Sequence, residues 1–195
     1  MKQREYFAKG KRSIVYKVIF QGKEAIQKVM KKTAPKGIIK NEAKWLRKLE
    51  KYKICPKLYK EGKDYIICEL IKGKRIADWI KEHNKKEIKT AIKKILNQCR
   101  TLDKLKVNKK ELQRPVKHII IGRTAKMIDF ERCKETDHPK NVTQFCQFLT
   151  SSNMAALLEE KGIIINKQGL IPLLKKYKKE QTEANFRKIS DYLSR

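Results

Sequence analysis

The sequence contains no long apolar segment. No run of 18 apolar residues occurs in its 195 residues, and the charged residues near Met1 are not followed by an apolar stretch. These absences argue against a membrane span and a secretory signal. We therefore expect a protein without a membrane partner.

The sequence also lacks paired cysteines. Its five cysteines are odd in number, widely spaced and free of any Cys-x-x-Cys motif. This pattern argues against a zinc site and against a disulfide framework. Reduced thiols and a cytoplasmic location are the expectation.

Acidic residues are scarce relative to basic ones. Fifty Lys and Arg residues against 21 Asp and Glu residues give a formal net charge of +29. A potential of this sign attracts polyanions, so RNA or a ribonucleoprotein is an expected partner. The alternative is the charged surface of a thermophile, but such surfaces combine Lys with Glu.

The first third of the chain has the pattern of strands around one helix. Residues 13–20 and 24–30 are rich in Ile and Val, and the turn Gln21-Gly22-Lys23 between them predicts a hairpin. Residues 38–52 have helical spacing. Two further strands are expected at 55–59 and 64–70, and a linker follows. We therefore predict two domains, 1–71 and 72–195.

Beyond the linker the pattern is mainly helical. A strand hairpin with its turn at 122–124 interrupts the helices, and its second strand is expected to end at Asp129. The expected helices cover residues 75–83, 85–106, 154–161, 168–178 and 180–193, with another beginning near Val142.

The segment from Lys126 to Cys133 places an acidic residue at the end of a short buried strand. Asp129 follows Met127 and Ile128 and precedes Phe130. Magnesium prefers hard oxygen ligands and usually takes one or two protein carboxylates, so Asp129 is a candidate magnesium ligand. The alternative is an Asp that caps the next turn.

Lys28 and Glu42 are candidates for an ion pair that holds phosphates. Lys28 lies on the second strand of the hairpin, 13 residues after Val15, where a strand lysine can reach a nucleotide's phosphates. Glu42 lies near the apolar stripe of the helix over 38–52. The alternatives are a lysine placed there by composition alone, and a Glu42 that pairs within its helix with Arg47 or Lys48.

In their order and spacing, these segments resemble the protein kinase superfamily. The resemblance is closest to the small archaeal predicted serine/threonine protein kinases related to RIO-type kinases, and it covers residues 6–149. Ala8, Gly10, Ser13 and Val15 follow the glycine-loop pattern G-x-G-x-x-G-x-V, with only the middle glycine kept. Glu111 stands where the family has the Asp of Arg-Asp-Leu, 18 residues before Asp129.

The resemblance implies a two-lobed, protein-kinase-like α+β fold. The sheet-rich N-lobe would be residues 1–71, and residues 72–195 would form a reduced helical C-lobe with the catalytic loop and the metal-binding hairpin. The implied cofactors are ATP and Mg²⁺ or Mn²⁺. Gly10, Ser13 and Val15 would cover the nucleotide.

The resemblance also implies roles for single residues. Lys28, paired with Glu42, would hold the phosphates, and the backbone from Glu69 to Ile71 would contact the adenine edge. Asp129 would bind the metal. Glu111 would accept the proton of the substrate hydroxyl, and Glu131 replaces the family's usual glycine.

The family's second metal ligand, an Asn, has no counterpart in this chain. Counting along the loop reaches Val116 or His118. His118 is a candidate metal ligand, but imidazole suits magnesium poorly, and we favour a phosphate or hydrogen-bonding role. Arg114 or Lys117 could stabilise charge on the transferred phosphoryl group, and the alternative for both is a lysine-rich surface.

Two functions follow from this pattern. The first is an ATP-dependent kinase that phosphorylates a hydroxyl on a protein or on itself. The second is a kinase-fold ATPase, or a non-catalytic module, that binds RNA or a ribonucleoprotein. The altered catalytic loop and the net charge favour the second. The segment after Cys133 is too short for a long activation segment, a reduction that RIO-type kinases share.

Overall fold

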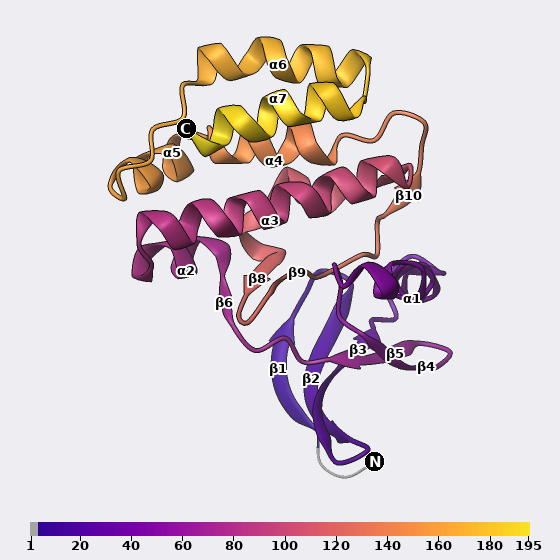
Figure 1. The fold of residues 1–195 in the computed structure, drawn as a ribbon. Coiled ribbons are helices and arrows are strands. Elements are labelled where there is room, and N and C mark those ends of the chain that lie inside the picture. Colours follow the sequence, from indigo (N-terminus) through magenta and orange to yellow (C-terminus); the bar gives the residue numbers. More distant parts are fainter. Residues whose placement is uncertain (1–3) are drawn as a thin grey trace. The chain divides into compact units, whose positions relative to one another are not determined.

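The computed structural model describes residues 4–195, and the chain divides into two compact units (Figure 1). The first unit contains the residues up to Gly73 together with Lys126–Cys133, and the second contains Lys74–Ala125 and Lys134–Arg195. The class is mixed α+β, with a sheet-rich N-terminal region and helices towards the C-terminus. The division differs from the expected one in that Lys126–Cys133 belongs to the first unit.

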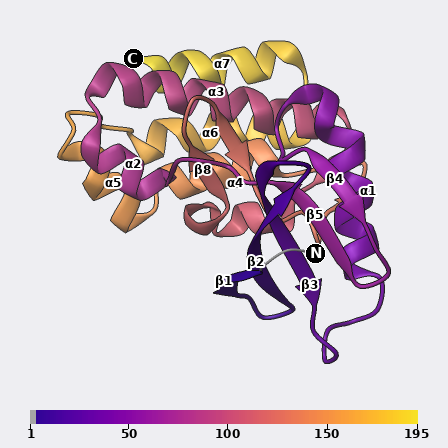
Figure 2. The same ribbon diagram turned by 90° about the horizontal axis from the view of Figure 1, so that it is seen from below.

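A five-stranded antiparallel sheet forms the framework of the first unit. Its strand order is β1-β2-β3-β5-β4, and Figure 2 shows β1, β2 and β3 side by side. The strands are β1 (Glu5–Lys9), β2 (Ser13–Phe20), β3 (Lys23–Met30), β4 (Leu58–Glu61) and β5 (Tyr65–Glu69). The five residues of β1 do not alternate between apolar and polar types, and all five are exposed. The sequence analysis therefore did not predict this strand.

The predicted β2–β3 hairpin is confirmed. Its two-residue turn has Gln21 at φ 50° and Gly22 at φ 74°. Two residues with positive φ give a backbone twist that matches the twist of the flanking strands. The register then pairs Val15 with Lys28 across the hairpin, and Lys28 with Ile66 on β5.

The two faces of this sheet have different contents. On one face, Val18, Ala25 and Ile67 form a buried cluster. Val15 and Lys28 share the other face, because directly paired residues point to the same side of a sheet.

The first unit also contains helix α1 (Ile38–Leu49). A 3-10 turn, η1 (Glu50–Tyr52), follows α1 and covers the rest of the predicted helix. The apolar stripe of α1 is buried, including Trp45 and Leu49, and so is Glu42. Glu42 is therefore a charged residue on the packed side of an amphipathic helix, where it requires a cation.

Two expected strands have different bounds in the structure. The strand expected at 55–59 begins at Leu58, after Pro56, which has no N–H to donate to a ladder. The strand expected to end at Asp129 is β9 (Ala125–Met127), which carries the chain from the second unit into the first. Asp129 lies beyond it, at φ 67°.

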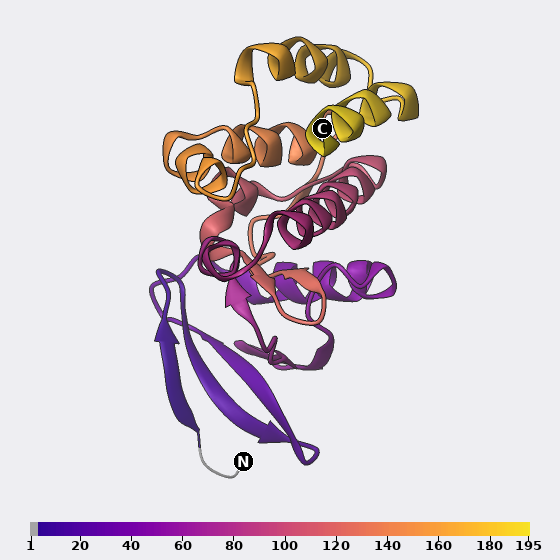
Figure 3. The same ribbon diagram turned by 60° about the vertical axis from the view of Figure 1, so that its left-hand side comes forward.

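The second unit is mainly helical. Its long helix α3 begins with a reciprocal capping box, in which Asn84 and Glu87 each accept from the other's backbone N–H. The helices are α2 (Ile76–Glu82), α3 (Lys85–Lys104), α4 (Asn141–Leu149), α5 (Ser152–Glu159), α6 (Lys167–Lys179) and α7 (Glu183–Ser194). Figure 3 shows α6 and α7 as neighbours.

Short elements connect these helices. The pairs are β6 (Lys74–Arg75) with β8 (Ile119–Ile121), and β7 (Val107–Asn108) with β10 (Lys134–Glu135). Between β7 and β8 the chain forms two 3-10 turns, η2 (Lys110–Gln113) and η3 (Pro115–Lys117). These turns contain or adjoin most of the residues predicted for the catalytic loop.

The structure bears on two expectations drawn from what the sequence lacks. Within residues 4–195, no helix is both long enough and apolar enough to cross a membrane. The five cysteines are buried free thiols. Burial raises the pKa of Cys55 and of Cys68 to about 12, so these two thiols are held in the protonated, unreactive form.

Candidate functional site

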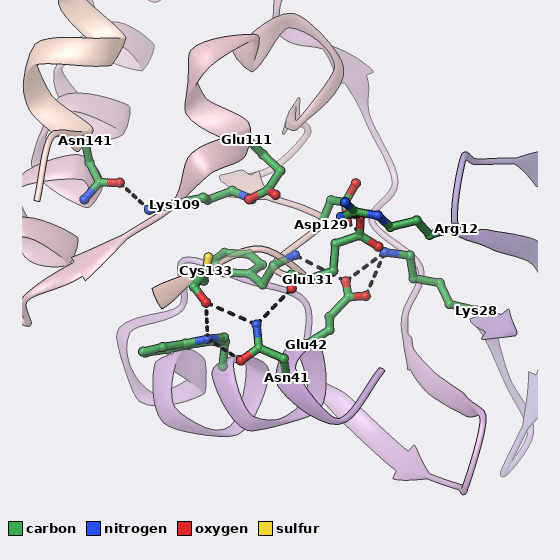
Figure 4. A network of polar contacts seen from close by, with 12 residues as sticks. Arg12, Lys28, Asn41, Glu42, Lys109, Glu111, Asp129, Glu131, Cys133 and Asn141 are labelled. Atoms are coloured by element: carbon green, nitrogen blue, oxygen red, sulfur yellow. Dashed lines mark hydrogen bonds and ion pairs between the residues drawn. The ribbon is translucent and has the colours of Figure 1, made fainter. Parts of the chain in front are cut away.

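Lys28 lies at the centre of a charged cluster in the first unit (Figure 4). Its Nζ is 2.8 Å from each carboxylate oxygen of Glu42 and 3.2 Å from Oδ1 of Asp129. The side chains of Lys28 and Glu42 are 14% and 4% exposed. The predicted pairing of Glu42 with Lys28 is therefore confirmed.

The two carboxylates keep Lys28 charged. Burial of the ammonium favours its neutral form, but the carboxylates of Glu42 and Asp129 outweigh burial and raise the pKa of Lys28 above its ordinary value. Lys28 is thus a fixed cation at the surface of a packed region.

Helix α1 holds the segment that follows Asp129. Asn41 Nδ2 donates to the carbonyl oxygens of Glu131 and Cys133, at 2.8 and 3.1 Å. Trp45 Nε1 donates to the Cys133 carbonyl at 3.0 Å. The N–H of Phe130 donates to Oε1 of Glu42 at 3.3 Å. These bonds explain why Lys126–Cys133 packs with the first unit.

Asp129 has a left-handed backbone conformation. Its φ of 67° is uncommon for a residue other than glycine, although Asp tolerates it better than most. Such conformations cost about 1–3 kcal/mol and gather at functional sites. Here the conformation accompanies a fully buried Phe130 and an Asp129 carboxylate in contact with Lys28.

A third carboxylate joins this cluster. Ligand atoms of Glu42, Asp129 and Glu131 lie within 4.8 Å of one another. Burial and the neighbouring Asp129 carboxylate raise the pKa of Glu131 above its ordinary value. Arg12, in the turn between β1 and β2, contacts Glu131 through Nη1 at 3.0 Å.

The sequence did not assign Arg12, Asn41 or Trp45 to this site. Asn41 is a polar residue next to Glu42 on a helix with an apolar stripe, which is the local signal that could have identified it. Arg12 has no such signal, because the chain is rich in basic residues throughout.

The residues expected to cover a nucleotide are also in the first unit. Gly10 lies in the β1–β2 turn, where its N–H donates to the Ser13 carbonyl at 2.9 Å. Val15 shares the sheet face of Lys28. The N–H of Glu69 donates to the Lys57 carbonyl at 2.9 Å, and Ile71 follows the end of β5.

Glu111 is in the second unit and is 2% exposed. Its Oε2 lies 3.4 Å from Nζ of Lys109, a lysine that is itself fully buried. Glu111, the base predicted from the sequence, is thus paired with Lys109, a lysine that the sequence analysis did not assign to the site.

His118 follows the turn η3 in the second unit. The cluster of three carboxylates described above does not include His118. No further cluster of three ligating side chains occurs in the described part of the chain. Instead His118, Arg114, Lys117 and Lys81 border a groove of about 940 Å³ whose described lining contains no acidic residue. This composition fits the phosphate role proposed for His118 better than the metal role.

A buried polar network holds the segment that carries Lys109. Asp103 is 3% exposed and accepts hydrogen bonds from the N–H and Nδ2 of Asn141, the N–H of Val142 and the hydroxyl of Tyr177. Asn141 in turn accepts from the N–H of Lys109 at 2.9 Å. Asp103 therefore anchors both the start of α4 and the segment before η2.

Comparisons with known proteins add no family. No protein-family model matches the chain, and no curated protein matches it. The geometry of the two units is therefore the basis for inferring a function.

Proposed function

We propose that this chain is an atypical ATP-dependent serine/threonine kinase with a two-lobed, protein-kinase-like fold. The supporting observation is the placement of Lys28 between Glu42 and Asp129, on the same sheet face as Val15. A strand lysine fixed by a helix glutamate, beside a carboxylate able to hold a metal, is the arrangement used to position nucleotide phosphates. Buried free thiols fit a reducing, cytoplasmic setting.

The donor groups fit magnesium or manganese with ATP. Asp129 and Glu131 supply hard carboxylate oxygens, and Glu42 is engaged by Lys28. Magnesium usually takes one or two carboxylates and completes its shell with water and phosphate oxygens. The bound metal supplies neutralisation of the phosphate charge.

The residues around Lys28 then have distinct tasks. Lys28, held by Glu42, would bind a phosphate oxygen, and Asp129 would hold the metal. Gly10 and Ser13 form the turn that covers the phosphates, and Val15 covers the adenine. Ile71 and the carbonyl of Glu69 contact its edge.

The second unit supplies the groups for the acceptor. Glu111 takes the proton of a serine or threonine hydroxyl on a protein substrate or on this chain, and the hydroxyl oxygen bonds to the γ-phosphorus as the bond to ADP breaks. Arg114, Lys117 and His118 border an anion-compatible groove that suits the charged product. Such groups stabilise charge that develops during transfer.

Transfer of labelled phosphate from ATP tests this proposal. With Mg²⁺ present, the purified chain is expected to label itself or a generic basic protein substrate, and Asp129→Ala is expected to reduce the rate by about 100-fold. Asp64→Ala is the matched control, because Asp64 is an exposed aspartate of the same unit. Equal inactivity of all three proteins would contradict the kinase proposal.

The burial of Glu111 favours a second candidate function. A carboxylate paired with buried Lys109 suits a kinase-fold ATPase or a non-catalytic module, and the net charge of +29 suits RNA or a ribonucleoprotein as its partner. RNA binding that weakens steeply with salt and survives Asp129→Ala, without phosphoryl transfer, would support this candidate.

Glu111→Gln tests the base directly. If the chain is a kinase that uses this carboxylate, the transfer rate is expected to fall by about 100-fold while ATP affinity stays within about twofold. Lys110→Gln, at the exposed neighbouring residue, is the control. A thermal melt checks that the variant remains folded although the buried Lys109 has lost its carboxylate partner. A transfer rate unchanged in Glu111→Gln would exclude Glu111 as the base.

A further inference from the structure

Helices α4 and α6 of the second unit border a groove of about 750 Å³, which we call the α4–α6 groove. Its apolar residues are Leu170, Ile171 and Leu174, all on α6. Four lysines line it, and none of the described lining residues is acidic. These lysines are Lys140, Lys167, Lys175 and Lys178.

Helix α6 carries more apolar surface than its own packing uses. Leu170 and Tyr177 are buried, at 1% and 0% exposure, and Tyr177 lies against Phe186 of α7. Ile171 is nevertheless 39% exposed, and Leu174 is half-buried. These two side chains form an apolar strip that the lysines of the groove border.

The charge along this surface has one sign. Residues 167–179 include five lysines and no acidic residue, and residues 141–149 of α4 carry no charge. A partner segment therefore gains from carrying negative charge at its edges. The apolar strip requires that the same segment also carry apolar side chains.

We propose that the α4–α6 groove docks an acidic amphipathic helix of a partner protein. The helix would place apolar residues on Ile171 and Leu174, and its acidic residues beside Lys175 and Lys178. Laying the apolar face of a helix in a groove is a recurring mode of recognition. The proposal does not depend on phosphoryl transfer, because every residue in it belongs to α4, α6 or their immediate flanks.

The lining of the groove favours a protein over RNA. Single-stranded RNA is held by bases that stack on aromatic side chains, and none of the described lining residues is aromatic. An apolar strip also offers nothing to a phosphate backbone. The test must therefore distinguish binding of a protein helix from binding of RNA at the same surface.

The probe is a fluorescein-labelled helical peptide with leucines at i, i+3, i+4 and i+7 and glutamates at most other positions. Its binding to the full chain is measured by fluorescence anisotropy. The same residues in scrambled order, without an apolar stripe, form the peptide control. The ordered peptide is expected to bind at least about tenfold more tightly than the scrambled one.

Two pairs of variants locate the site on the protein. Lys175→Glu with Lys178→Glu is expected to weaken binding by about tenfold. Lys176→Glu with Lys179→Glu makes the same charge change at exposed positions of α6 outside the groove lining and is expected to have less than about a threefold effect. Ile171→Gln is expected to weaken binding, while Ile164→Gln, at a residue that is 80% exposed and outside the groove, is not.

Three results would overturn the proposal. The first is equal affinity for the ordered and scrambled peptides. The second is an equal loss of peptide affinity in the two double-lysine variants. The third is displacement of the peptide by a uridylate 12-mer whose own affinity falls in the Lys175→Glu, Lys178→Glu protein. The last would assign the groove to RNA. Phosphoryl transfer by the same variants, measured in parallel, keeps a failure here separate from a failure of the kinase proposal.

Discussion

Lys28→Met is expected to destabilise the first unit by about 3 kcal/mol and to reduce phosphoryl transfer by at least about 100-fold. Loss of the ammonium leaves Glu42, which is only 4% exposed, with the N–H of Phe130 as a donor at 3.3 Å. It also leaves three carboxylates within 4.8 Å of one another without their central cation. A buried charge that loses its partner costs more than the pair contributes.

The two tryptophans allow this loss to be assigned to one unit. Trp45 lies in the first unit and Trp79 in the second, so Trp45 fluorescence in a Trp79→Phe background reports urea unfolding of the first unit. Lys60→Met, on an exposed lysine of β4, is the matched control and is expected to change stability by less than about 0.5 kcal/mol.

A double substitution separates stability from activity. Lys28→Met combined with Glu42→Gln removes both charges and is expected to recover about 1 kcal/mol or more of the stability, but not the phosphoryl transfer. Additive losses of stability would show that the two residues are not energetically coupled. Recovery of the activity would show that the pair does not position phosphates.

Asp103→Ala is expected to destabilise the second unit by about 3–5 kcal/mol. The substitution leaves the N–H groups of Asn141 and Val142, the Nδ2 of Asn141 and the Tyr177 hydroxyl without the acceptor they share. Buried donors without an acceptor lose their hydration on folding without compensation.

Tyr177→Phe is the graded comparison for Asp103→Ala. It removes one donor to Asp103 and one acceptor from Arg100, so a loss of about 1–2 kcal/mol is expected. Trp79 fluorescence in a Trp45→Phe background measures both variants against the same reference. A loss for Asp103→Ala no larger than that for Tyr177→Phe would show that water replaces the carboxylate.

Local patterns predicted much of the fold. The β2–β3 hairpin and the helix over residues 38–52 were predictable because alternation and helical periodicity are properties of short segments. The exposed strand β1 was not, since neither of its faces is buried. The strand before Asp129 is two residues shorter than expected, because Asp129 adopts a positive φ that no residue pattern marked.

Part of the candidate site was also predictable. Lys28 and Glu42 are 14 residues apart, on neighbouring elements whose type the sequence indicated. The burial of Glu111 was not predictable, because a carboxylate among lysines looks the same in sequence whether it is solvated or packed. Only packing distinguishes the two cases, and here it buries Glu111 beside Lys109.

By itself the sequence determined the class of elements, their order, the net charge of +29 and the presence of a strand lysine and a helix glutamate. Tertiary structure decided which charges meet. Asp129 contacts Lys28 across 101 residues, and Glu131 contacts Arg12 across 119. Such contacts depend on how segments distant in sequence pack against one another, because these residues share no local periodicity that could place them together.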